Sequence, residues 1–92
     1  MQGTIVWYSP KKTQGIISVT ENGIVQKYFL LQSRIARSPE VIKAGQFARF
    51  IAVAPPPKQG LLPVALAVEI SDMPFVDAGV NALATSQTEV RQ

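Results

Sequence analysis

The dipeptide Asn22–Gly23 constrains this chain most, because it lies between two runs of apolar and β-branched residues, Ile16–Thr20 and about Ile24–Gln32. Both residues tolerate positive φ, and the type I′ turn that joins two antiparallel strands requires positive φ at both central positions. The sequence therefore predicts a β-hairpin here. A run of β-branched and aromatic residues, Thr4–Tyr8, predicts an earlier strand that ends in a turn at Ser9–Lys12.

Two further strands are predicted after the hairpin, at Gln46–Val53 and at about Val64–Ile70. Between the third and fourth strands, Ser38–Gly45 offers a capping Ser, a Pro at the first helical position and a closing Gly, which predicts one or two helical turns. The segment Pro55–Gly60 predicts a stiff, exposed loop. Five short strands favour a small closed barrel, and a five-stranded antiparallel barrel with a helical turn between strands three and four is the OB-fold arrangement. The expected fold class is all-β.

Charge divides the 92 residues into a body and a tail. Residues 1–68 carry eight basic and two acidic side chains, whereas residues 69–92 carry one basic and four acidic ones. We expect one domain over residues 1–70 and an acidic C-terminal tail over residues 71–92, in which Phe75–Val76 could anchor the tail to the body. A basic body with an acidic tail is typical of proteins that hold phosphate backbones, although chance clustering on a soluble surface gives the same pattern.

Composition argues against most enzymes. The chain has no His and no Cys, its carboxylates form no close pair, and it has no Gly-rich phosphate loop. We therefore expect a protein without catalysis, cofactor or metal site. The longest apolar stretch, Leu61–Val68, is too short to cross a bilayer, and the N-terminus lacks a secretory signal, so we expect a cytoplasmic protein with no membrane partner.

Five segments occur in the order and with the approximate spacing of a known family. The segments Gly3–Tyr8, Lys12–Ile17, Tyr28–Ile35, Ala44–Phe50 and Pro63–Val68 together resemble the bacterial cold-shock domain. The resemblance covers about residues 1 to 70. It implies an OB-fold that binds single-stranded nucleic acid with little sequence preference, by stacking bases on aromatic side chains.

The chain departs from the family at several stacking positions. Gln14 and Ile16 replace two Phe, Leu31 replaces His, and Gln32 replaces the last Phe of the second motif. The resemblance leaves three aromatic residues as candidate stackers, beside basic residues that would track phosphates. The candidate nucleic-acid-binding residues are Trp7, Tyr8, Lys12, Ile16, Lys27, Phe29, Leu31 and Arg34.

Strand alternation assigns these residues to faces. On the predicted second strand Ile16 faces outward, and on the third strand Phe29 and Leu31 share one face, whereas Tyr8 has the parity of the inner face. The outward set Ile16, Phe29 and Leu31 beside Trp7 is a reduced stacking platform, a subunit interface, or both. Since 47% of the residues are hydrophobic, we expect a homodimer or larger oligomer. For Arg49 we expect a structural ion pair.

The predicted partner is single-stranded DNA or RNA, and no residue pattern selects between them. Two alternatives remain open. One is a dimeric single-stranded-DNA-binding protein of the phage or plasmid type. The other is a protein-interaction or structural module that retains the barrel without binding nucleic acid. Oligonucleotide binding that weakens as salt rises would distinguish the two nucleic-acid-binding hypotheses from the protein-interaction or structural module.

Overall fold

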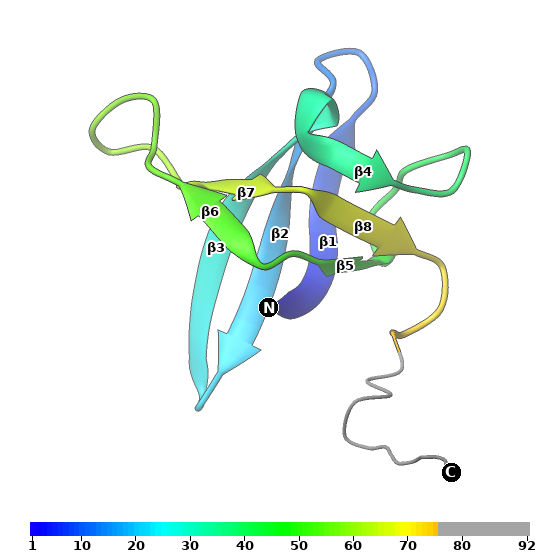
Figure 1. The fold of residues 1–92 in the computed structure, drawn as a ribbon, viewed down its shortest axis with the longest axis horizontal. Coiled ribbons are helices and arrows are strands. Elements are labelled where there is room, and N and C mark those ends of the chain that lie inside the picture. The colour runs from blue at the N-terminus through cyan, green and yellow to red at the C-terminus, as the bar shows by residue number, and fades with distance from the viewer. Residues whose placement is uncertain (76–92) are drawn as a thin grey trace, which may run out of the picture.

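The structure is a computed structural model that describes residues 1–75 of the chain. This part is all-β, as the sequence predicts, with eight strands and one 3₁₀ helix (Figure 1). The elements in chain order are β1 (Gln2–Ser9), β2 (Gln14–Glu21), β3 (Ile24–Leu31), η1 (Gln32–Arg34), β4 (Ile35–Arg37), β5 (Phe47–Arg49), β6 (Ala52–Ala54), β7 (Val64–Leu66) and β8 (Val68–Ser71).

The predicted hairpin is confirmed. Asn22 and Gly23 have φ values of 54° and 78°, and they join β2 to β3. The two strands pair antiparallel without a shift, from Glu21 opposite Ile24 to Gln14 opposite Leu31. The long β2–β3 arm projects beyond the rest of the sheet (Figure 1).

The prediction of five strands is wrong, because two of the predicted strands are each divided and one strand was not foreseen. The predicted fourth strand consists of β5 and β6, and the predicted fifth consists of β7 and β8. Their pairing keeps one register, from Phe47 opposite Ser71 to Ala54 opposite Val64. Ala67, which separates β7 from β8, has a φ of 51°. A residue in this left-handed region turns the chain and interrupts the ladder. The unforeseen strand is β4.

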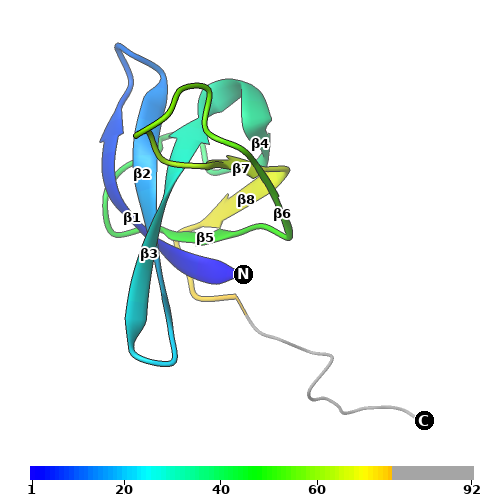
Figure 2. The same ribbon diagram turned by 90° about the vertical axis from the view of Figure 1, so that its left-hand side faces the viewer.

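The prediction of a purely antiparallel sheet is also wrong. β3 pairs parallel with β7 at Phe29 and Val64, and β4 pairs parallel with β8 from Ile35 and Val68. The strand order is β4-β8-β5-β1-β2-β3-β7-β6. In this order β7 and β8 stand far apart, yet only Ala67 separates them in the chain. The sheet must therefore curl, and it forms a half-barrel (Figure 2).

The predicted helix over Ser38–Gly45 is absent, and the helical turn lies earlier, at η1. The buried amide of Gln46 accounts for the difference. Its Oε1 accepts from the Lys43 backbone N–H at 2.9 Å, and its Nε2 donates to the Val41 carbonyl at 2.8 Å. These bonds satisfy backbone groups that a helix would otherwise pair. Within residues 1–75, no helix is long and apolar enough to span a membrane.

The hydrophobic core fills the inside of the curl. Its largest fully buried side chains are those of Phe50, Ile5, Ile17, Leu30, Val19 and Val68. On β2 the inward residues are buried and their neighbours are partly exposed, which confirms the predicted alternation. The rings of Tyr28 and Phe50 form a T-shaped pair with 5.1 Å between their centroids.

The start of the predicted tail belongs to the body. Ser71 ends β8, and the Asp72 carboxylate accepts from Gln46 Nε2 at 2.8 Å. Arg49 forms the expected ion pair, with its guanidinium 2.6 Å from Glu69, and the Phe75 ring packs against that guanidinium at 4.4 Å. The boundary predicted at residue 70 therefore falls inside a strand. Residues 76–92 of the predicted tail, including Val76, lie outside the described residues.

Candidate nucleic-acid interface

A β-bulge in β1 decides which way its aromatic residues face. Ile5 lies opposite Ile17 on β2, but Trp7 lies opposite Ile16, so Val6 is an extra residue in the ladder. Val6 and Trp7 are consequently both exposed, by 46% and 43%. Without the extra residue, strict alternation from the buried Ile5 would direct the indole of Trp7 into the core.

Gly15 allows the strands to approach closely beside this bulge. A Cβ at Gly15 would collide with the backbone carbonyl oxygen of Trp7, and it would lie 2.9 Å from Cδ1 of Tyr8. After the bulge, Tyr8 faces inward and packs against the core. The structure thus places Tyr8 on the face opposite Trp7, as its predicted parity indicates, and away from the other candidate stackers.

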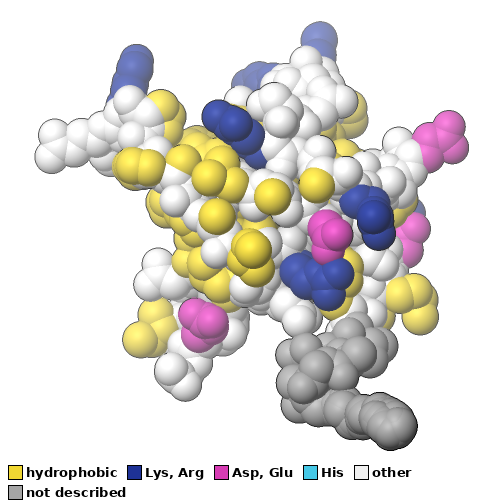
Figure 3. Space-filling view, in the orientation of Figure 1, with side chains coloured by type: hydrophobic (Ala, Val, Ile, Leu, Met, Phe, Trp, Pro, Cys, Tyr) yellow, Lys and Arg dark blue, Asp and Glu magenta, His cyan; other side chains and the backbone are white. Residues whose placement is uncertain are grey.

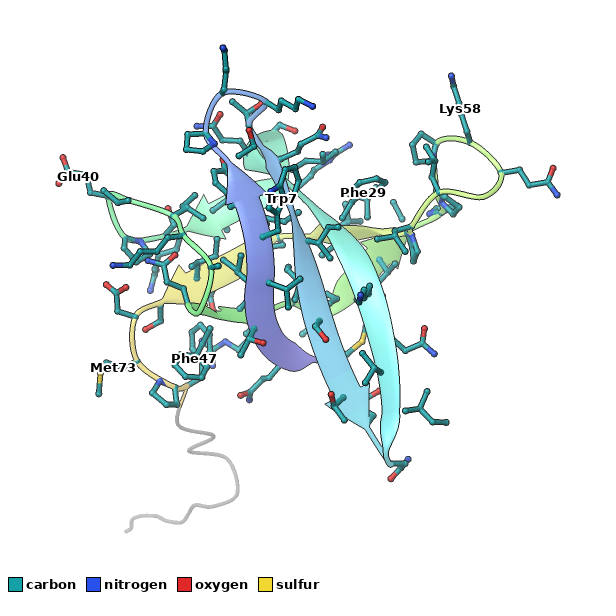
Figure 4. All side chains as sticks on the ribbon, turned by 180° about the vertical axis from the view of Figure 1, so that it is seen from behind. Trp7, Phe29, Glu40, Phe47, Lys58 and Met73 are labelled. Atoms are coloured by element: carbon teal, nitrogen blue, oxygen red, sulfur yellow. The ribbon has the colours of Figure 1, made fainter. Side chains whose placement is uncertain are left out.

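One row of side chains crosses the outer face of three strands. Trp7 on β1 pairs with Ile16 on β2, and Ile16 pairs with Phe29 on β3. Ile16 and Phe29 are half-buried, so each offers part of its apolar surface to solvent. Figure 4 shows Trp7 and Phe29 on this side of the meander formed by β1, β2 and β3. We call the residues Trp7, Ile16 and Phe29 the aromatic row.

A shallow hollow of about 340 Å³ lies at one end of this outer face. It is lined by side chains from the β1–β2 turn, the start of β2 and the chain after β3: Lys12, Thr13, Gln14, Leu31, Gln32 and Ser33. Leu31 on β3 pairs with Gln14 on β2, two residues along each strand from the pair of Phe29 and Ile16, so both pairs lie on the same face. Among residues 1–75, no carboxylate lines the hollow. Five of its six lining residues are polar, and Lys12 is the charged one, although more of the lining surface is apolar than polar.

Two of the predicted basic residues flank the aromatic row. Lys12 lines the hollow at one end, and Lys27 lies on the outer face two residues before Phe29 on β3. Both side chains are exposed. Arg34 is exposed at the end of η1, but it lines a different hollow, with Leu66 of β7 among its walls. The structure therefore groups six of the eight predicted residues on the outer face, whereas Arg34 lies beyond this face and Tyr8 packs against the core.

The sequence reasoning missed four residues that line the hollow. Thr13 and Ser33 carried no signal of their own, whereas Gln14 and Gln32 were noted only as departures from the family pattern. Thr13 has a φ of 54°, and its carbonyl accepts from the Gln32 backbone N–H at 3.1 Å. This bond joins the β1–β2 turn to the chain after β3. Among residues 1–75, no three acidic side chains cluster closely enough to hold a metal ion.

No family model matches the chain, and no curated protein matches it. The resemblance to the cold-shock domain therefore stays a prediction.

Proposed function

We propose that the curled sheet is an OB-type barrel of the cold-shock kind, and that its outer face binds single-stranded nucleic acid with little sequence preference. One observation carries this proposal: the bulge at Val6 holds Trp7 out of the core and in register with Ile16 and Phe29. A bulge that re-aims a large aromatic side chain into solvent is a costly arrangement for packing alone. It is well suited to a binding face.

The aromatic row would supply the contact with bases. Trp7 and Phe29 lie on strands that flank β2, so their backbones are about 10 Å apart, with Ile16 between them. Two unpaired bases would stack on the two rings, and Ile16 would contact the apolar surface between them. Since every base has a π-face, this mode of binding is tolerant of sequence.

The basic residues would hold the phosphates on both sides of the row. Lys12 lies toward the hollow, and Lys27 lies toward the Asn22–Gly23 turn. A strand running along the outer face would meet a positive charge before and after its stacked bases. Such contacts release counterions, so the affinity would fall as salt rises. Duplex DNA would bind less well, because its bases already stack on one another.

Quenching of Trp7 fluorescence by poly-dT and poly-U tests the proposal directly, since Trp7 is the single Trp of the chain. Lys12→Ala should reduce the slope of log affinity against log salt by about 0.7. Lys58→Ala is the matched control, because Lys58 is exposed on the loop between β6 and β7, remote from Trp7 in Figure 4. It should leave the slope unchanged. Equal effects of the two variants would argue against a defined phosphate path.

Phe29→Leu separates base stacking from apolar contact with a protein. Leu keeps an apolar side chain at the position but removes the aromatic face, so oligonucleotide affinity should fall by about 1–3 kcal/mol. Trp7→Ala should weaken binding by a similar amount, and Trp7→Phe should restore much of it. If no oligonucleotide binds below about 100 μM at low salt, or if duplex DNA competes equally, the outer face is not a nucleic-acid platform. It would then be a surface for a protein partner.

A further inference from the structure

The sheet ends in two edge strands, β4 and β6. Within residues 1–75, β6 pairs only with β7, from Ala52 opposite Leu66 to Ala54 opposite Val64. Its other side presents backbone N–H and C=O groups that no described strand pairs. Such an edge is a template for a further strand, and natural proteins usually limit its pairing with charges, a bulge, prolines or a very short strand.

The β6 edge carries no such charges. No charged residue occurs from Phe50 to Pro57. Ile51, directly before β6, is 89% exposed and is the most exposed large apolar side chain in the described part of the chain. Hydrophobic side chains gather over β6 and β7 in Figure 3. The consecutive prolines after Ala54 lack N–H donors, so pairing at this edge is limited to a short segment.

We propose that β6 pairs antiparallel with β6 of a second copy of this chain, across a two-fold axis at Val53. A two-fold axis at Val53 sets Ala52 of one copy against Ala54 of the second copy. Because the segment Ala52–Val53–Ala54 is symmetric about Val53, both of these paired residues are alanine. The same register sets Ile51 against Pro55 of the second copy. Each copy thereby covers the exposed Ile51 of the other with an apolar residue, and small side chains meet small ones.

Charge favours β6 over the other edge. β4 ends in Arg37 and directly follows Arg34, and both side chains are exposed. Two copies joined through β4 would crowd four arginines, two from each copy, around one short interface, which is unfavourable for like charges. At β6 two chains, each with a net charge of +3, meet where no charged residue lies.

The proposed interface differs from the one expected from the sequence, and it does not depend on the proposed function. The outward set Ile16, Phe29 and Leu31 is half-buried, whereas Ile51 stands almost fully exposed. The apolar surface over β6 is seen in Figure 3, and Trp7 and Phe29 are labelled in Figure 4, which views the molecule from the opposite side. A dimer through β6 would leave both aromatic rows open.

Sedimentation of the full chain over a range of micromolar concentrations tests the interface. The wild-type chain should dimerise, and Ile51→Lys should weaken self-association about tenfold or more, because a charge would then lie at the apolar contact. Val41→Lys is the matched control: Val41 is 65% exposed on the loop before β5, and its substitution adds the same charge. A monomeric wild-type chain, or equal weakening by the two variants, would overturn the proposal. Loss of the dimer on removal of residues 76–92 would also overturn the proposal, because that segment, and not β6 of the second copy, would then be what occupies the β6 edge.

Cross-linking tests the antiparallel register. Because the chain has no Cys, Ala52→Cys and Ala54→Cys each introduce a single thiol. Mixing the two variants under mild oxidation should give a disulfide-linked pair faster than either variant alone, since only the mixed dimer sets the two thiols directly opposite each other. Val41→Cys should give only slow cross-linking. Equal yields from the mixed and single preparations would overturn the pairing at Val53.

Discussion

Gly15→Ala should destabilise the fold strongly for a steric reason. Gly15 is paired with Tyr8 beside the bulge of β1. A Cβ there would collide with the carbonyl oxygen of Trp7 and would lie 2.9 Å from Tyr8 Cδ1 and 3.0 Å from Tyr8 Cα. Two of these three atoms belong to the backbone. They cannot rotate away, so β1 and β2 would have to separate.

The cost should be near the upper end of that for overpacking a core, about 3 kcal/mol in the free energy of unfolding. Of the groups in conflict with the new Cβ, only the Tyr8 ring could rotate away, and that ring packs against the core. Because a small domain has about 5–15 kcal/mol of stability, the variant should still fold. With a urea dependence of about 1 kcal/mol per molar, the midpoint should fall by about 3 M.

Urea unfolding followed by Trp7 fluorescence and by circular dichroism measures this cost. Gly23→Ala is the control, because a Cβ at Gly23 meets no atom within 4 Å, although its φ is 78°. Its cost is therefore conformational alone, about 1 kcal/mol. A loss below 1 kcal/mol for Gly15→Ala, or equal losses for the two variants, would refute the argument that Gly15 is required for close approach of the strands.

Three further outcomes are expected. Ala67→Gly should raise the melting temperature by about 2–6 °C, because Gly adopts the φ of 51° found at Ala67 without strain; an unchanged value would contradict this. Gln46→Leu should lower the free energy of unfolding by about 2–3 kcal/mol in a urea titration, since it leaves buried backbone groups without partners; a loss under 1 kcal/mol would argue against that role. Removing residues 76–92 should strengthen oligonucleotide binding at low salt, because this segment has two acids and one base, and unchanged affinity would give it another role. Cutting before Ser71 is a poorer test, since it also removes the partner of Phe47.

Local chemistry was enough to predict the meander. The Asn22–Gly23 turn, the strand that follows it and the alternation along β2 all depend on residues adjacent in the chain. Turn preferences and two-residue periodicity act over a few residues, so they can be read without knowing the partner strand. The outward direction of Ile16 and Phe29 followed from the same periodicity.

Features that depend on distant residues were not predictable in the same way. The bulge at Val6 is a mismatch between β1 and β2, so neither strand reveals it alone. The absence of a helix over Ser38–Gly45 follows from the Gln46 amide, which is held in turn by Asp72. The two parallel pairings arise only when the sheet curls. The sequence alone therefore determined an all-β chain with aromatic and basic candidates, and it indicated an outward Trp7 and an inward Tyr8. Tertiary pairing decided how both directions fit a strand on which Ile5 is buried, because the extra residue Val6 in the ladder reverses the face of every side chain that follows it.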